Sequence, residues 1–204
     1  MYLFCDLETT GLNPRRDVIL EFAAALVDNE LELLAERNNI FPMCYRVQEL
    51  LANGDPIVRE MHTANHLLVD MARLQAEGNA LSHGYYKRVL DYSVLDWLTD
   101  IGCEPGELEL AGSSVHFDRS FLEEHLPQLA AFVHYRNFDT STLKRAAMRW
   151  APEYYKRNPI FEQESSHRAL SDVRHSIEIA RAVANIFSVS ETLWPGQPPV
   201  VDIP

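Results

Sequence analysis

After its first methionine the chain reads Tyr2-Leu3-Phe4-Cys5-Asp6-Leu7-Glu8-Thr9-Thr10-Gly11. The apolar character of residues 2–7 predicts a buried strand that ends at a turn. Asp6 and Glu8 stand two positions apart, so on a strand their carboxylates point from the same face. Two such charges repel each other at a buried position unless a cation lies beside them. The segment therefore predicts a strand that carries a metal site.

Four more strands are expected along the chain, at residues 18–27, 31–41 and 107–111, with a short fifth strand ending at Phe138-Asp139. Turn signals at Gly11-Leu12-Asn13-Pro14 and at Asp28-Asn29 make the first three strands an antiparallel meander. Helical patterns lie at residues 46–52, 57–65, 89–101, from Asp118 onward, 140–150 and 168–187. The order of these elements, β-β-β-α-β-α-β-α, predicts an α/β fold.

The element boundaries follow from local residue types. Thr140 is expected to cap the helix that runs to Trp150, and Ser165 or Ser166 to cap the last helix. Residues 75–92, where the periodicity fades, are expected to form a loop or insertion. The proline-rich residues 188–204 are expected to form an extended or disordered tail. We expect one domain over residues 1–187 and the tail after it.

The composition indicates a globular protein outside the membrane. Hydrophobic residues make up 47% of the 204 residues and charged residues 24%, which is typical of a folded domain. The longest apolar run, residues 22–27, is too short to span a bilayer. The start lacks the basic region of a signal peptide, and the three cysteines form no Cys-x-x-Cys motif. We therefore expect a cytoplasmic protein with no membrane partner.

The net charge of the chain limits its ligands. It is −12, from 18 Lys and Arg against 30 Asp and Glu. This is the wrong sign for a protein that binds long nucleic acid by neutralising many phosphates. Bound divalent cations would cancel part of this acidity. If the ligand is a polyanion, we expect it to be short.

The residues that point to chemistry are Asp6, Glu8, Asp118, His167 and Asp172. Phosphodiester hydrolysis with two metals needs carboxylates that bridge ions about 3.5–4 Å apart, and oxygen-rich sites of this kind suit Mg²⁺ or Mn²⁺. This hypothesis requires the first strand, the helix at Asp118 and the last helix to converge. His167, five residues before Asp172, is then placed to act as a general base.

Each of these residues also has an ordinary structural explanation. Asp118 is a suitable helix N-cap, Asp172 a solvated helix residue and His167 a surface histidine near a helix start. Asp6 and Glu8 are suitable charges for an edge strand. Taken singly, each carboxylate fits the ordinary explanation better, and only the complete set favours catalysis.

The local contexts of these residues carry a family resemblance. The runs concerned are Asp6-Leu7-Glu8-Thr9-Thr10-Gly11-Leu12, Asp17-Val18-Ile19-Leu20-Glu21, Met61-His62-Thr63-Ala64, Gly112-Ser113-Ser114-Val115-His116-Phe117-Asp118, His134-Tyr135-Arg136-Asn137-Phe138-Asp139-Thr140-Ser141-Thr142-Leu143-Lys144, Arg149-Trp150 and His167-Arg168-Ala169-Leu170-Ser171-Asp172. The first, fourth and last runs resemble the three motifs of the DEDDh 3′–5′ exonucleases. Over most of its length the chain is similar to the oligoribonuclease family. The resemblance implies a ribonuclease H-like fold with a central mixed five-stranded sheet flanked by helices.

The resemblance also implies roles for individual residues. Two divalent cations, Mg²⁺ or Mn²⁺, would be held by Asp6, Glu8, Asp118 and Asp172, with His167 as general base. Leu12 would pack against a base, and His62 would lie near the substrate. The 5′-phosphate of a dinucleotide would be enclosed by Ser114, Arg136, Ser141 and Thr142. Tyr135 would reach into the partner subunit's site of a homodimer. Ser113 replaces the asparagine usual in the family, and residues 75–92 and the tail match none of its motifs.

The function that we expect is 3′–5′ exoribonuclease activity on very short single-stranded RNA, above all 5′-phosphorylated dinucleotides, with release of 5′-mononucleotides by a two-metal-ion mechanism. The alternative is a DEDDh exonuclease that trims longer RNA or single-stranded DNA, which the acidic charge disfavours. A third hypothesis is a catalytically silent binding module. The complete Asp/Glu/Asp/His/Asp set argues against silence, because drift without catalysis is free to lose any of the five.

Overall fold

The centre of the protein is a five-stranded sheet with strand order β3-β2-β1-β4-β5 in the computed structural model. The structure describes residues 1–77 and 82–193, with side chains as far as residue 187. β1 (Tyr2–Thr9), β2 (Ile19–Val27) and β3 (Leu33–Ile40) form the antiparallel meander that was predicted. β4 (Glu109–Gly112) and β5 (His134–Asp139) run parallel to β1. The predicted mixed sheet is thereby confirmed.

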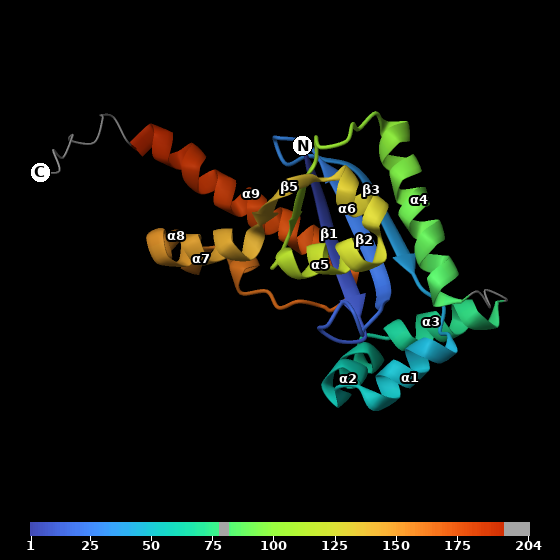
Figure 1. Cartoon of the computed structure of the whole chain (residues 1–204). Helices are drawn as coiled ribbons and strands as arrows, with labels where there is room; N and C mark the ends of the chain where they lie inside the picture. The colour runs from blue at the N-terminus through green and yellow to red at the C-terminus, as the bar shows by residue number, and fades with distance from the viewer. Residues whose placement is uncertain (78–81, 194–204) are drawn as a thin grey trace, which may run out of the picture.

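Helices cover both faces of the sheet and one of its ends (Figure 1). Their bounds are α1 (Tyr45–Asn53), α2 (Pro56–Ala64), α3 (Leu67–Ala76), α4 (His83–Ile101), α5 (His116–His125), α6 (Pro127–Phe132), α7 (Thr140–Trp150), α8 (Pro152–Arg157) and α9 (Ala169–Leu193), with a 3₁₀ turn at Pro159–Phe161. Figure 1 shows α1, α2 and α3 beyond the end to which β1 points, and α9 on the opposite side of the sheet from α5 and α6. No helix among the described residues combines the length and the hydropathy needed to cross a membrane.

The two faces of β1 pack into two different cores. Leu3, Cys5 and Leu7 belong to the core that α4, α5 and α6 cover. Phe4 belongs to the second core, whose other members include Val173 on α9. Because side chains alternate along a strand, positions 6 and 8 continue the face of Phe4. The sheet therefore directs both carboxylates of β1 toward the side of α9.

Residues 75–92 were predicted to form a loop or insertion, and the loop is wrong for residues 75–76 and 83–92, which are helical. α3, which was not predicted, runs to Ala76, and α4 begins at His83 with the Ser82 side chain accepting from the amide of Tyr85. The His83 ring stacks on Phe41 at 5.0 Å between centroids, and its Nε2 lies 2.9 Å from the Ile19 carbonyl oxygen. These tertiary contacts stabilise a helix start that the local pattern does not indicate. Residues 78–81 lie outside the described residues.

Other predicted boundaries also need correction. α5 begins at His116, so Asp118 lies in its first turn and is not its cap. Asp139, not Thr140, caps α7, because a carboxylate oxygen of Asp139 accepts from two amides of the first turn.

The last helix differs from its prediction at both ends. Ser165 and Ser166 do not cap α9; the first amide of α9, that of Ala169, donates to the Glu21 carboxylate instead, at 3.1 Å. α9 continues to Leu193, so the extended tail predicted from Ser188 is wrong for residues 188–193. The rest of the predicted tail, residues 194–204, lies outside the described residues.

Candidate active site

The strand β1 places two of the predicted carboxylates on one face at its carboxyl end. Glu8 is 6% exposed, and Asp6 is partly buried. The pairing of β1 with β2 is regular as far as Glu8, which lies opposite Glu21, and shifts by one residue between Glu8 and Thr9. Three acidic side chains therefore gather where the ladder becomes irregular. Irregularities of this kind are frequent next to active sites because they redirect side chains.

Asp118 is fixed to β1 by a backbone hydrogen bond. β4 pairs with β1 only as far as Phe4, so the edge of β1 beyond that point has no strand partner on this side. The Leu7 amide donates to Oδ1 of Asp118 at 3.0 Å. A Cβ at Gly112 would lie 2.6 Å from the carbonyl oxygen of Cys5, so only glycine lets β4 turn into α5 this close to β1. Asp118 is consequently 3% exposed, and Asp6 is close enough to raise its pKa.

Asp172 and His167 approach the same place from the start of α9. One ligand atom each of Glu8, His167 and Asp172 lie within 4.8 Å of one another. The Asp172 carboxylate accepts from the hydroxyl of Ser165 and from the amide of Ser166 at 2.9 Å. His167 has a positive φ of 52°, and its carbonyl accepts from the side chain of Asn65. The structure thus brings together segments that are about 160 positions apart in the sequence.

The electrostatics of this cluster favour a cation. Burial, followed by the charges of Asp172 and Glu21, raises the pKa of Asp6 to about 7. Burial raises the pKa of Glu8 to about 9, with Asp6 as the next cause. The pKa of Asp118 is also well above its usual range, through burial and then Asp6. Full ionisation of the cluster is therefore costly unless positive charge joins it. Clustered carboxylate oxygens are the donors that Mg²⁺ and Mn²⁺ prefer, so these residues fit divalent cations.

A cavity of about 250 Å³ opens beside the cluster. It is lined by Asp6 and Asp172 together with Ser113, Lys144 and Ser165, among other residues. Lys144 brings a positive charge from α7 to the edge of a strongly acidic site. The cavity gives an anionic ligand access to the carboxylates without crossing the core.

A second layer of residues, which the sequence did not reveal as functional, supports the loop that carries His167. Nε of Arg168 lies 3.1 Å from Oε2 of Glu21, which is 1% exposed. Other nitrogens of the same guanidinium lie 3.1 Å from a carboxylate oxygen of Asp70 and 3.3 Å from the carbonyl oxygen of Asn65. Arg168 therefore joins β2, α3 and the turn after α2 at the residue next to His167. The only sequence signal for this role is the position of an arginine directly after the predicted base.

His62 lies behind Glu8 rather than in open space. Its ring is completely buried, its Nε2 lies 3.0 Å from the Thr9 carbonyl oxygen, and its Nδ1 lies 3.7 Å from Oε2 of Glu8. Burial lowers the pKa of His62 and favours the neutral ring. A carbonyl can only accept, so Nε2 carries the proton and Nδ1 faces Glu8 with a lone pair. Contact of His62 with substrate stays a prediction.

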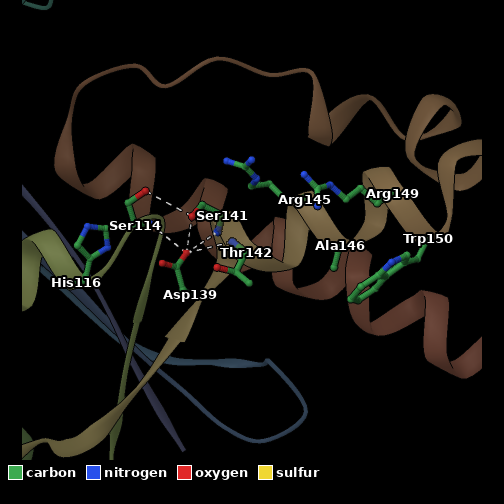
Figure 2. A pocket seen from close by; sticks show the side chains of 9 residues that line it. All are labelled: Ser114, His116, Asp139, Ser141, Thr142, Arg145, Ala146, Arg149 and Trp150. Atoms are coloured by element: carbon green, nitrogen blue, oxygen red, sulfur yellow. Dashed lines mark hydrogen bonds between the residues drawn. The ribbon is translucent and has the colours of Figure 1, made fainter.

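The residues predicted to enclose a 5′-phosphate fall into two groups. Ser114, Ser141 and Thr142 line one cavity of about 570 Å³ (Figure 2). Arg136 does not line it; its guanidinium carbon lies 5.6 Å from the ring centroid of Tyr135 on the exposed strand β5. Tyr135 is 75% exposed, and Leu12, in the turn between β1 and β2, is 80% exposed. Within one chain the structure thus brings the hydroxyl groups together and leaves Arg136 outside.

Comparisons with known proteins agree with this architecture. The model of the exonuclease family matches residues 3–76 and 94–180. The oligoribonuclease of Cutibacterium acnes is 33% identical over 178 residues, which are 87% of this chain and 81% of that protein. The oligoribonuclease of Dichelobacter nodosus is 35% identical over 184 residues, which are 88% of this chain and 90% of that protein.

Solved structures of exonuclease I share the fold. The enzyme from Methylocaldum szegediense superposes with a TM-score of 0.60 at 18% identity over 90% of this chain. The Escherichia coli enzyme in complex with a dT13 oligonucleotide gives 0.58 at 16% identity. This chain spans 40% and 43% of the length of those two proteins. The family match and the oligoribonuclease relatives, which align over most of their own length, identify the family more specifically than the shared fold does. The chain belongs to the exonuclease family and, within it, to the oligoribonucleases.

Proposed function

We propose that this chain is a cytoplasmic 3′–5′ exoribonuclease that hydrolyses very short single-stranded RNA to 5′-mononucleotides. The observation that carries the proposal is the meeting of Glu8, His167 and Asp172 beside buried Asp6 and Asp118. The names of the relatives support RNA as the substrate. The net charge of −12 supports a short one, since an acidic surface offers a long RNA few backbone contacts.

The proposed cofactors are two divalent cations, Mg²⁺ or Mn²⁺, held by Asp6, Glu8, Asp118 and Asp172. When bound, such cations supply Lewis acidity that activates water and stabilises charge on the leaving oxygen. The chain itself fixes the positions of the carboxylates. The Leu7 amide holds Asp118, and the donors of Ser165 and Ser166 hold Asp172.

His167 is proposed as the general base, and its hydrogen bonds support the required tautomer. The Ser165 hydroxyl has a single proton, which it donates to the Asp172 carboxylate. Nδ1 of His167 lies 3.3 Å from the same hydroxyl oxygen, which can therefore only accept a hydrogen bond from Nδ1. The proton of the neutral ring is then on Nδ1. Nε2 keeps a free lone pair on an exposed side chain and is able to take a proton from water.

The preferred substrate is proposed to be a 5′-phosphorylated dinucleotide. Its terminal phosphate would lie with Ser114, Ser141, Thr142 and Arg136, and Leu12 would pack against a base. A terminal phosphate carries more charge than an internal diester, so a site built for it discriminates against a longer chain. His62 would act near the substrate through its contact with Glu8.

A homodimer is proposed, with Tyr135 reaching into the partner's site. Support comes from the 75% exposure of this ring on an edge strand. Exposed aromatic rings are enriched at subunit interfaces, because they combine a large apolar area with few rotatable bonds.

The test is hydrolysis of 5′-labelled RNAs from two to twenty nucleotides in the presence of Mg²⁺, Mn²⁺ or a chelator. We expect the highest kcat/KM for the dinucleotide, a decline with length, and no hydrolysis with the chelator. Equal or greater kcat/KM for a seven-nucleotide RNA would favour the alternative of an exonuclease that trims longer RNA or single-stranded DNA. Absence of hydrolysis at every length with both metals would favour a silent binding module.

A further inference from the structure

The cavity that holds the hydroxyl groups of Ser114, Ser141 and Thr142 also holds two arginines that the family resemblance did not assign. Arg145 and Arg149 line it together with His116, Asp139, Ala146 and Trp150. Arg145 lies three residues after Thr142 and four before Arg149, so these side chains stand near one another along α7. Figure 2 shows the Arg145 guanidinium extending toward the side where Ser114 and Ser141 lie, with Arg149 one turn farther along.

Asp139 determines what this cavity can bind without the arginines. Its Oδ1 accepts from the amides of Ser114, Ser141 and Thr142 at 3.2, 2.9 and 3.3 Å, and from the Ser141 hydroxyl at 2.6 Å. The amides at the start of α7 are therefore already used by a side chain of the protein. The Ser114 hydroxyl donates to the Ser141 hydroxyl at 3.4 Å, so of the three hydroxyl groups only that of Thr142 has a proton that no other described residue accepts. A phosphate would then meet a carboxylate and one available hydroxyl donor, which is unfavourable for an anion.

The two arginines reverse this balance. Among the described residues, neither one forms an ion pair or hydrogen bond, whereas Arg168, Arg174 and Arg181 each pair with a glutamate. Two guanidinium groups and one carboxylate give the cavity an excess of one positive charge in a chain whose net charge is −12. A terminal phosphate carries about −1.5 to −2 charges at neutral pH and so gains more from this excess than an internal diester.

We propose that Arg145 and Arg149 bind the terminal 5′-phosphate in addition to the residues already proposed for it, and that they strengthen the preference of this chain for 5′-phosphorylated ends. The inference rests on the proposed function and names the specificity residues of that same site. Guanidinium groups suit the task because they stay charged and fork onto two phosphate oxygens. Arg136 of the same chain lies against Tyr135 and does not line the cavity.

The experiment compares one dinucleotide with and without a 5′-phosphate. The ratio of the two kcat/KM values is measured for wild type, Arg145→Ala, Arg149→Ala, the double variant and Arg145→Lys. Each alanine variant is expected to lower the ratio about tenfold, since a charge-assisted hydrogen bond is lost, and the lysine variant to fall less. Arg88→Ala on α4 is the control: it removes the same charge from an exposed arginine outside both cavities and should leave the ratio unchanged.

A binding measurement without metal separates this inference from the proposed function. Fluorescently labelled dinucleotides with and without the 5′-phosphate are titrated with chelator-treated protein. The wild type is expected to bind the phosphorylated form more tightly, and the double variant to lose most of that difference. This pattern supports the inference even if no RNA is hydrolysed, which would contradict the proposed function alone. An unchanged phosphate preference in the double variant, or no such preference in the wild type, would overturn the inference and leave exoribonuclease activity unaffected.

Discussion

Removal of Arg168 tests whether the loop of His167 is held by the ion pairs behind it. In Arg168→Ala the donors that remain to buried Glu21 among the described residues are the Asn38 side-chain amide, at 3.0 Å, and the Ala169 amide, at 3.1 Å. Breaking one side of a buried pair costs about 3–5 kcal/mol. Because these two donors remain and Arg168 is 28% exposed, we expect the lower end, about 3 kcal/mol of unfolding free energy. Displacement of His167 should lower kcat by about 10- to 100-fold.

Arg174 provides a matched control on the same helix. It pairs with Glu36 of β3 through two hydrogen bonds, but this pair is much more exposed: the side chain of Arg174 is 57% exposed and that of Glu36 31%, against 1% for Glu21. Exposed pairs contribute about 1 kcal/mol at most, so Arg174→Ala should lose less than this and keep kcat. Urea unfolding gives the two free energies, and hydrolysis of a dinucleotide at saturating substrate gives kcat. Arg168→Lys, which keeps the charge, should recover part of both losses.

The kinetic result decides between support of the base and simple stabilisation. A variant that is only less stable keeps the kcat of its folded fraction below its unfolding temperature. If Arg168→Ala and Arg174→Ala show the same kcat, Arg168 has no special role in positioning His167. If they lose the same free energy of unfolding, the pair with buried Glu21 stabilises the fold no more than the exposed pair does.

Three further outcomes are expected. Asp118→Ala should abolish hydrolysis almost completely, and activity within threefold of wild type would contradict the two-metal hypothesis. His167→Ala should slow hydrolysis by a factor of about 10²–10⁴, while calorimetry still detects cation binding. Tyr135→Ala should raise the activation free energy of dinucleotide hydrolysis by about 1–3 kcal/mol, the value of a base–aromatic stack, while sedimentation still shows a dimer. A wild-type protein that is monomeric and fully active would disprove this role. Folding raises the pKa of Asp6 from 3.8 to about 7 and that of Glu8 from 4.5 to about 9, so the folded protein binds these protons more tightly than the unfolded chain. The unfolding free energy of the metal-free protein should therefore fall as pH rises through this range. Mg²⁺ should remove most of that decline in thermal unfolding, and identical pH profiles with and without Mg²⁺ would contradict this.

The sequence predicted those features that depend on local periodicity. The spacing of Asp6 and Glu8 placed both on one face of a strand, and the structure has them on the face that α9 covers. The meander, the mixed sheet and the family resemblance are likewise confirmed. The catalytic and substrate-binding roles of individual residues stay predictions. The acidic residues gather with His167, and the hydroxyl groups of Ser114, Ser141 and Thr142 line one cavity, whereas Arg136 does not line it.

The features that the sequence did not reveal depend on contacts between distant segments. Glu21 and Arg168 are 147 positions apart, and no local pattern pairs them. The start of α4 depends on His83 stacking against Phe41, and the cap of α9 on a carboxylate from β2. The sequence predicted Thr140 as the cap of α7, and only the structure shows the Asp139 carboxylate accepting from three amides. In each case a tertiary contact outweighs a weak local preference.

The two cavities share their walls in a way that bears on substrate length. Ser113 lines the cavity beside the carboxylates, and the next residue, Ser114, lines the cavity of the arginines. Likewise Lys144 of α7 faces the first cavity and Arg145 the second. Adjacent Cα atoms are about 3.8 Å apart, so the turn between β4 and α5 and the helix α7 hold the cavities at a short separation. On the proposed function, one cavity receives the scissile phosphate and the other the terminal phosphate. The walls between them then select the number of nucleotides that separate the two phosphates, and an RNA of another length satisfies only one cavity at a time.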